Sequence, residues 1–323
     1  MAKHYQLSVL KTRHVAGVEV TSVSVTDKYY KPNLRVERTL VRALLNFLQH
    51  YLEAFPNVKH DSPFNIARMF VYLPSGMRAW REYMPDGMAT HYVHNPENRN
   101  MTNGGRLDFI TQRFFRHSYD ATGVRSRAYV LSWLVLQHVG GSKHPVHWLS
   151  IAAGSGQPVY DVIDELSATE RDNVSLMIED VNEEILAFAK DNYKQLQPGV
   201  SSVKFEHASI LDATKRDQLF ADFKPTVIDA MGLFEYLSEK DSAELLRAAY
   251  AALPIGGMMI FTNMSPRHPH LELHKRGLGW PGVIQRTMHE VLSIMDTAGI
   301  PGDARDIYHA EDKIYNIYRI VKQ

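Results

Sequence analysis

An apolar run ends in two glycines and a proline in the sequence Leu149-Ser150-Ile151-Ala152-Ala153-Gly154-Ser155-Gly156-Gln157-Pro158. Such a stretch is typical of a strand, a tight turn and the start of a helix, because glycine permits the turn and proline is tolerated in a first helical turn. Short apolar runs alternate with helical patterns from there to Val321. This alternation predicts an α/β fold with a mostly parallel sheet covered on both faces. In such sheets ligands bind beyond the carboxyl ends of the strands.

The next predicted strand ends in acidic residues, in the sequence Ile178-Glu179-Asp180-Val181-Asn182. A carboxylate at this point can accept hydrogen bonds from both hydroxyl groups of a ribose. The alternative is that Asp180 caps the following helix, but Asn182 can take that role and leave Asp180 for a ligand. With the glycine turn, Asp180 indicates a nucleoside-type ligand.

The turn does not fit the two best-known nucleotide motifs. A dinucleotide fingerprint needs a third small residue so that helix and strand pack closely, and here that position is Val159. A pyrophosphate cradle is therefore disfavoured. A P-loop is excluded, because no Gly-Lys-Ser/Thr follows the glycines.

Composition narrows the classes of partner. Lys+Arg and Asp+Glu both number 36 in 323 residues, so a net charge of zero gives no general attraction to nucleic acid or anionic membrane. The chain has no cysteine, which excludes disulfides and a thiolate nucleophile. No run approaches the roughly 20 apolar residues of a membrane span, and the start lacks the apolar core of a secretory signal. We expect a cytoplasmic protein with no nucleic-acid or membrane partner.

The chain before Gly140-Gly141 has a different pattern. Apolar residues recur at three- and four-residue spacing from Glu37 to Phe55 and from Val124 to Val139, which predicts amphipathic helices. The segment from Tyr83 to Gly105 is rich in Asn, Gly, Pro and Met and indicates a loop. β-branched alternation near Val18-Glu19-Val20-Thr21 indicates a short hairpin or an arm.

These patterns predict two units. Residues 1–140 form a mainly helical region, and residues 141–323 form the sheet domain that binds the ligand. We expect the helical region to cover the ligand cleft as a lid and to contribute substrate contacts. Helices in this place also commonly form a dimer surface, so a homodimer is compatible with the sequence.

Over about residues 145–323 the chain resembles the class I S-adenosylmethionine (SAM)-dependent methyltransferases. Each of the landmarks is degenerate alone, but all occur in order at family-like spacing. The resemblance implies a Rossmann-like sheet of seven strands with an antiparallel last strand, and two final apolar runs agree with such a terminal hairpin. The landmarks are the loop Ala153–Gly156, the strand tip Asp180–Asn182, His207–Asp212, Asp229–Leu237 and Leu253–Gly257.

The resemblance also implies SAM as the cofactor and names its contacts. The glycine loop lines the methionine part, Asp180 holds the ribose, and Val181 lies on the adenine face. Ser209 stands where the family often has Asp or Asn for the adenine edge, which leaves the Ile210 backbone as a contact. Met231 lies near the sulfonium. The implied cofactor contacts are Tyr119, Arg125, Ala153, Gly154, Gly156, Asp180, Val181, Ser209, Ile210 and Met231.

Tyr119 and Arg125 enter that set through the segment Tyr119–Arg127, which resembles a segment of related small-molecule methyltransferases. There an arginine can meet the cofactor carboxylate. The alternative is a helix N-terminus with solvated arginines. A further stretch, Gly232–Leu237 with Asn263–His270, resembles a bacterial branch that forms methyl esters of hydroxy fatty acids.

The candidate catalytic residues are Tyr236, His268 and His270. An aromatic ring suits a neighbouring sulfonium, and a histidine can accept the proton of an alcohol or amine acceptor. A carboxylate acceptor needs no base. His268, His270 and His274 could bind zinc on an irregular loop, but no His-Glu-x-x-His pattern occurs and methyl transfer needs no metal, so we predict none.

The sequence therefore predicts a methyltransferase that acts on oxygen or nitrogen of a small-molecule acceptor, with a hydroxyl and a carboxylate both open. Two alternatives remain. One is another use of the same cofactor pocket, such as aminopropyl transfer. The other is a cofactor-binding module without catalysis.

Overall fold

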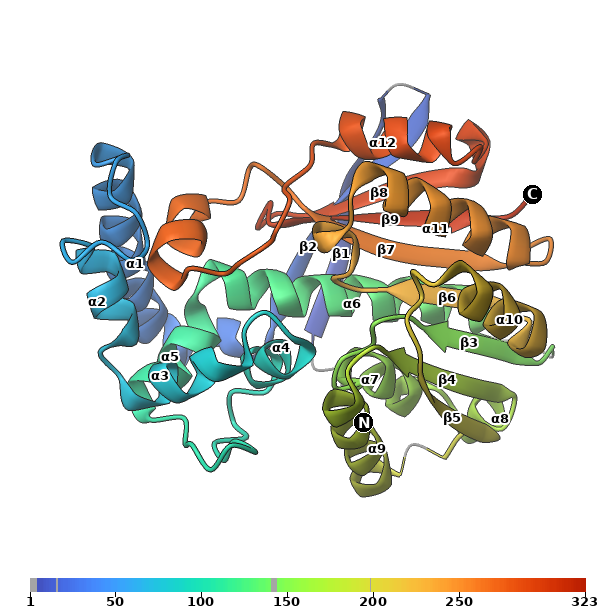
Figure 1. Ribbon diagram of the computed structural model, residues 1–323, viewed down its shortest axis with the longest axis horizontal. Helices are drawn as coiled ribbons and strands as arrows, with labels where there is room; N and C mark the ends of the chain where they lie inside the picture. Colours follow the sequence, from blue (N-terminus) through green and yellow to red (C-terminus); the bar gives the residue numbers. More distant parts are fainter. Residues whose placement is uncertain (1–4, 16, 141–143, 198) are drawn as a thin grey trace.

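The described residues form one nine-stranded sheet flanked by helices (Figure 1). The computed structural model describes residues 5–15, 17–140, 144–197 and 199–323. The strand order is β1-β2-β8-β9-β7-β6-β3-β4-β5. The strands are β1 (Tyr5–Val15), β2 (Val18–Asp27), β3 (Val146–Ser150), β4 (Val174–Asp180), β5 (Ser202–His207), β6 (Val227–Ala230), β7 (Met258–Met264), β8 (Arg305–Ala310) and β9 (Tyr315–Val321).

Seven of these strands have the expected arrangement. β3 to β7 pair in parallel, and β9 runs antiparallel to both β7 and β8, which confirms the antiparallel last strand. The count of seven was too low for the whole sheet. The N-terminal hairpin β1–β2 joins it, because β2 pairs in parallel with β8. The β-branched alternation at Val18–Val25 thus belongs to the main sheet.

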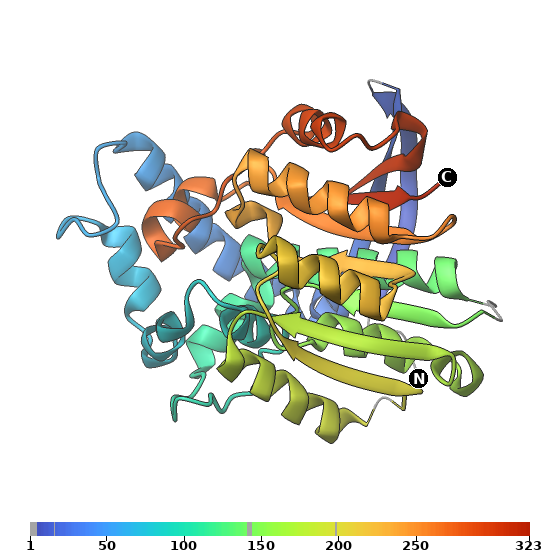
Figure 2. The ribbon, with the colours of Figure 1, turned by 45° about the vertical axis from the view of Figure 1, so that its right-hand side comes forward.

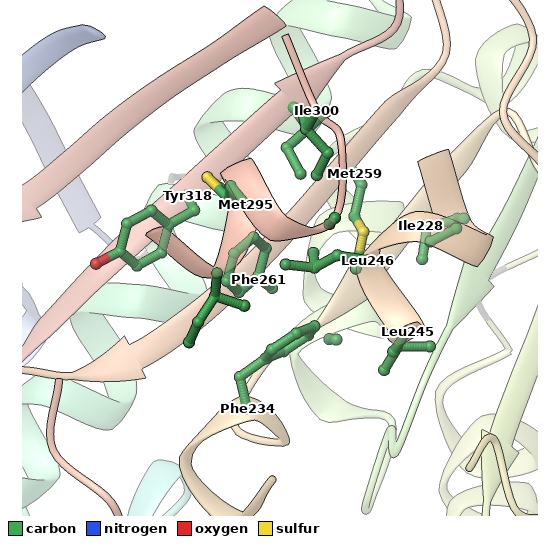
Figure 3. Packing of buried hydrophobic residues seen from close by; sticks show 14 of the residues in the cluster. Ile228, Phe234, Leu245, Leu246, Met259, Phe261, Met295, Ile300 and Tyr318 are labelled. Carbon is green, nitrogen blue, oxygen red and sulfur yellow. The ribbon is translucent and has the colours of Figure 1, made fainter. Parts of the chain in front are cut away.

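Helices cover both faces of the sheet, as the strand pattern predicts (Figure 2). Neighbouring residues of one strand enter opposite cores: Met259 and Phe261 pack on one side, Met258 and Ile260 on the other. The first side is covered by α10, α11 and α12, and Figure 3 shows Phe261 with Leu246 of α11 and Met295 of α12. The helices of this part are α7 (Gln157–Glu165), α8 (Ala168–Arg171), α9 (Glu183–Leu196), α10 (Ala213–Phe223), α11 (Glu239–Ala252) and α12 (Met288–Thr297).

A helical region precedes β3 and lies at the carboxyl ends of the strands (Figure 1). It has a core of its own, with Leu48, Trp80 and Tyr92. Its last helix, α6, also packs against the sheet, with which it shares the second core. The helices of this region are α1 (Arg35–Ala54), α2 (Ile66–Tyr72), α3 (Ser75–Trp80), α4 (Gly87–His94), α5 (Phe109–His117) and α6 (Tyr119–Val139).

Two features of this region differ from the sequence patterns. The segment from Tyr83 to Gly105 is not all loop, because α4 forms within it, capped by the Asp86 carboxylate. The helical core also contains a segment from the far end of the chain. The short π-helical turn η5 (Leu273–Leu278) lies against α1 and α2 in Figures 1 and 2 and buries Leu273 and Leu278 in the helical core.

Short 3-10 turns complete the chain: η1 (Lys28–Tyr30), η2 (Pro32–Leu34), η3 (Arg81–Tyr83), η4 (Phe234–Tyr236) and η6 (Gly302–Ala304). Gly140 ends α6, and its neighbour Gly141 lies outside the described residues. Within the described ranges, no helix combines the length and the apolar character needed to cross a membrane.

Candidate active site

A cavity of about 330 Å³ lies between the strand ends and the helical region. This volume is typical of a small-molecule site. Its floor comes from the ends of β3, β4 and β6, and its cover comes from α4, α5, α6 and the segment after β7. The floor residues include Ser150, Ala153, Gly154, Asp180, Val181, Asp229, Met231 and Tyr236; the cover residues include Trp80, Gly87, His91, His94, Phe115, Asp120, Arg127, His274, Leu278 and Trp280.

Asp180 stands at the edge of this floor. Its side chain accepts hydrogen bonds from the backbone N–H of Gly154 and of Asn182, each at 2.9 Å. Burial raises the pKa of the Asp180 carboxyl. Asn182 caps α9 through its own side chain, as predicted, so Asp180 is not needed as the cap. Val181 is 64% exposed although it is apolar, and it borders the cavity.

The glycine turn is covered by backbone from the helical region. A Cβ built on Gly87, at the start of α4, would lie 2.5 Å from the Cα of Gly154. Two glycines thus meet face to face across the cavity wall. Gly154 has a φ of 58°, which favours glycine for a second reason. The cover at this point is part of the site, since it fixes how closely α4 approaches the turn.

Two buried acids stand at the end of β6 and just after it. Asp229 accepts hydrogen bonds from Trp148 Nε1 at 2.7 Å and from Ser150 Oγ at 3.0 Å, and burial raises its pKa to about 7. Glu235 lies 3.5 Å from Arg127 Nη1. Burial raises the pKa of Glu235 as well. Each acid therefore has protein partners before any ligand arrives.

Arg125 and Arg127 lie on different sides of α6. Arg125 does not line the cavity: it is 1% exposed, pairs with Asp27 at 2.6 Å, and donates to the backbone carbonyls of Phe115 and Arg116. It ties the end of β2 to the helical region. Arg127 lines the cavity instead. The segment Tyr119–Arg127 thus contributes an arginine, but not the one singled out from the sequence.

Other sequence-predicted residues also lie away from the cavity lining. Tyr119 packs edge-on against His270, with ring centroids 4.6 Å apart. Gly156 caps α7, and a Cβ there would meet the Tyr160 ring. Ile210 is buried in the sheet core, and Ser209 beside it is half-buried. None of Tyr119, Gly156, Ser209, Ile210, His268 and His270 belongs to the lining, whereas Ala153, Gly154, Asp180, Val181, Met231 and Tyr236 do.

The histidines after β7 separate into two groups. His270 Nε2 contacts Asn46 Oδ1 at 2.6 Å, and burial lowers the pKa of His270 to about 4. His274 lines the cavity, and its Nδ1 lies 2.5 Å from Asp120 Oδ1. His268 Nε2 lies 3.3 Å from the same oxygen. The sequence pointed to His268 and His270, whereas of these three histidines it is His274 that lines the cavity.

Aromatic side chains form one end of the cavity. Trp80 packs against Phe115 and Trp280, with ring centroids 5.0 and 5.7 Å apart. Trp280 Nε1 donates to the Tyr236 hydroxyl at 2.6 Å. Burial raises the pKa of Tyr236 to about 12, so the phenol stays protonated near neutral pH and can donate a hydrogen bond.

Residues 64–305 match the protein family described as "Putative methyltransferase". The chain belongs to this family. The match starts well before β3 and includes the helical region from α2 onward. None of the curated proteins matches the sequence.

Solved structures agree with this family at the level of the fold. A Bordetella parapertussis protein described as a possible exported protein superposes with a TM-score of 0.62 at 13% identity, covering 91% of this chain and 99% of that one. Magnesium protoporphyrin IX methyltransferase from Synechocystis PCC 6803, solved with bound S-adenosylhomocysteine (SAH), has a TM-score of 0.50 at 12% identity and covers 77% of this chain and 100% of that one.

Family and fold together identify a methyltransferase with the class I fold. The resemblance stated from the sequence is therefore confirmed at the level of the family. Neither the family description nor these two structures name a hydroxy-fatty-acid acceptor, so that branch stays a prediction.

Sequence reasoning missed the residues of the cover. Gly87, Asp120, Arg127 and His274 reach the cavity only through tertiary packing. One signal was present: Asp86 before Gly87 has the form of a helix N-cap. The others carry no local signature that separates them from neighbouring residues of the same type.

Proposed function

We propose that this methyltransferase acts on a small molecule bound under the helical cover, with the cofactor held along the floor by Asp180 and the glycine turn. The observation that carries the proposal is the buried Asp180 carboxylate at a cavity edge, beside the glycine turn and an exposed apolar Val181. Each carboxylate oxygen has one backbone donor and can still accept a ribose hydroxyl.

Arg127 is the arginine that we assign to the cofactor carboxylate. It lines the cavity, and its contact to Glu235 is long, at 3.5 Å, for a charge-assisted hydrogen bond. A planar guanidinium can bind a carboxylate with two parallel hydrogen bonds. Met231 and Tyr236, also in the lining, would then lie toward the reacting methyl group.

The chemistry asks little of the protein beyond position and a dry cavity. SAM supplies a methyl group on a positively charged sulfur, which is already a good leaving group. Aligning two reactants contributes on the order of 7–11 kcal/mol to the barrier reduction. The Gly87–Gly154 contact and the Trp80–Trp280 wall close the cavity and exclude water at two places.

The cavity favours methyl transfer over aminopropyl transfer. A polyamine acceptor calls for acids that are free to bind ammonium groups. Asp229 already accepts from Trp148 Nε1 and Ser150 Oγ, with one donor on each carboxylate oxygen. The far wall is aromatic instead, which suits an acceptor with a largely apolar body.

Calorimetry with SAM and SAH tests the cofactor site first. We expect both to bind to the purified full-length chain. Turnover of SAM with a panel of small hydroxy, amino and carboxylic compounds, followed by mass spectrometry of the methylated product, then separates an enzyme from a binding module. Binding of neither SAM nor SAH would end the proposal, and binding without turnover of any compound would favour the module.

A further inference from the structure

The strongest feature outside the assigned cofactor contacts is the pair His274 and Asp120. His274 sits on η5, and Asp120 sits in the first turn of α6, 154 positions earlier in the chain. Their Nδ1 and Oδ1 atoms lie 2.5 Å apart, a short charge-assisted hydrogen bond. Both residues border the cavity.

The charge state of Asp120 follows from its neighbours. Burial alone would raise its pKa, but His268 and His274 beside it hold the pKa of the Asp120 carboxyl well below its usual range. Asp120 is therefore an acceptor of hydrogen bonds. His274 must donate to it from Nδ1, so the neutral form of the ring has its lone pair on Nε2. That Nε2 is buried and has no hydrogen-bond partner among the described residues.

His268 has the opposite arrangement. Its Nδ1 accepts the backbone N–H of His270 at 2.9 Å, so the ring proton of neutral His268 is on Nε2. His268 Nε2 lies 3.3 Å from Asp120 Oδ1, a close contact that lacks the geometry of a hydrogen bond. Of the two imidazoles, His274 donates to Asp120 and keeps a nitrogen that has no partner in the described part of the chain, whereas the Nδ1 lone pair of His268 accepts the His270 N–H.

The same tautomers argue against a metal at this cluster. Asp120, His268 and His274 bring one ligand atom each within 4.8 Å of one another. A metal would need the lone pair of His268 Nε2, but with Nδ1 already accepting a backbone proton that nitrogen carries hydrogen. The tautomers at this cluster therefore favour bound protons over a bound metal ion.

We propose that His274 is the general base of the reaction, that Asp120 and His268 are positioning residues that fix its tautomer, and that the acceptor atom is a hydroxyl oxygen. This inference rests on the methyltransferase function proposed above. His274 Nε2 takes the hydroxyl proton while the acceptor oxygen forms a bond to the methyl carbon. The carbon–sulfur bond breaks, and its electron pair stays on sulfur. The products are a methyl ether, SAH and an imidazolium ion paired with Asp120, which later releases its proton to water.

The surroundings of His274 give the class of acceptor. The His274 ring stacks with Trp280 at a centroid distance of 6.1 Å, and Trp280 packs against Trp80. Leu278 and Phe115 continue the same wall. A flat apolar body carrying one hydroxyl, such as a phenol or naphthol, can stack there and place its oxygen beside the histidine.

The kinetic test compares His274→Gln with wild type on phenols and naphthols of graded acidity, at one fixed pH. We expect kcat to fall by about 100- to 10,000-fold on the least acidic phenols, since this is the usual contribution of a positioned base. The loss should shrink as the acceptor becomes more acidic, because an ionised phenol needs no base. Asp120→Asn should show the same trend with a smaller loss. His289→Gln, on the exposed surface of α12, is the matched control.

A second measurement does not depend on finding the acceptor. Nitrogen NMR of histidine-labelled protein with bound SAH reports which ring nitrogen carries the proton, and spectra of His274→Gln and His268→Gln assign the two signals. We expect the proton on Nδ1 of His274 and on Nε2 of His268. A proton on Nε2 of His274 would overturn the inference.

Three other results would overturn it while leaving the cofactor site intact. These are equal losses on all phenols, methylation of carboxylic acids but of no hydroxyl compound, and activity that chelators abolish and zinc restores. Calorimetry with SAH on each variant keeps folding separate from catalysis. Failure of wild type to bind SAH would instead refute the proposed function itself.

Discussion

The two walls of the cavity are assembled in different ways. The floor comes from successive strand ends of one sheet, between Ser150 and Tyr236, and its backbone is fixed by the parallel ladder. The cover combines helices before the sheet with η5 after β7, which meet only in the folded chain. Floors of this kind are shared by a whole fold class, whereas covers are individual. We infer that the floor determines which cofactor binds and that the cover determines which acceptor binds.

The largest effect on the floor is expected from Asp180→Ala. The change removes the acceptor for the ribose and leaves the Gly154 N–H without a partner. Two hydrogen bonds to a charged group are worth about 3 kcal/mol or more, or roughly a 100-fold loss of SAH affinity. Calorimetry of SAH binding measures this loss of affinity. Asp191→Ala, an exposed position on α9 paired only with Lys194, is the control. An unchanged SAH affinity would break the assignment of the floor to the cofactor.

A smaller effect is expected where floor and cover touch. In Gly87→Ala the new methyl group would lie 2.5 Å from Gly154 Cα, so backbone must move. Overpacking of this kind costs about 1–3 kcal/mol. We expect a lower melting temperature and weaker SAH binding together. Gly302→Ala, whose added methyl group would meet open space, should change neither. A loss of stability with full SAH affinity would show that the two walls are independent at this contact.

The smallest effect is expected from Trp280→Phe, a change in the cover at its contact with Tyr236 of the floor. Phenylalanine keeps a ring beside Trp80 but loses the donor to Tyr236. One hydrogen bond of about 1 kcal/mol corresponds to about a fivefold rise in KM for the acceptor. SAH affinity should not change. Trp133→Phe, which packs against Tyr308 away from the cavity, provides the comparison. Weaker SAH binding with an unchanged KM would contradict the division of labour between the walls.

The sequence predicted the floor because its signals are local. The glycine turn, Asp180 and the Asn182 cap all lie within single strand-to-helix junctions, where the chain itself brings the groups together. Ser209 and Ile210 show the limit. Both follow a strand of the same sheet, yet the Ile210 backbone donates to the Glu179 carboxyl and neither residue reaches the cavity.

The cover could not be predicted in the same way. Arg125 and Arg127 are two residues apart on α6, so their side chains leave the helix about 200° apart. Only one of them can therefore face the cavity. The sequence does not say which. His274 lies four residues beyond His270, but its partner Asp120 belongs to α6, 154 positions earlier in the chain. The helix α4 was hidden by flanking Pro and Asn residues that indicate a loop.

The pairing of β2 with β8 has a consequence for synthesis of the chain. β2 is made before β8, so Glu19–Val23 finds its parallel partner only when Asp306–Ala310 has followed. Until then the hairpin presents one unpaired strand edge, a surface on which other chains can dock. Completion of this side of the sheet therefore joins two strands that lie far apart in the sequence, with Ser22 pairing with His309, 287 positions later.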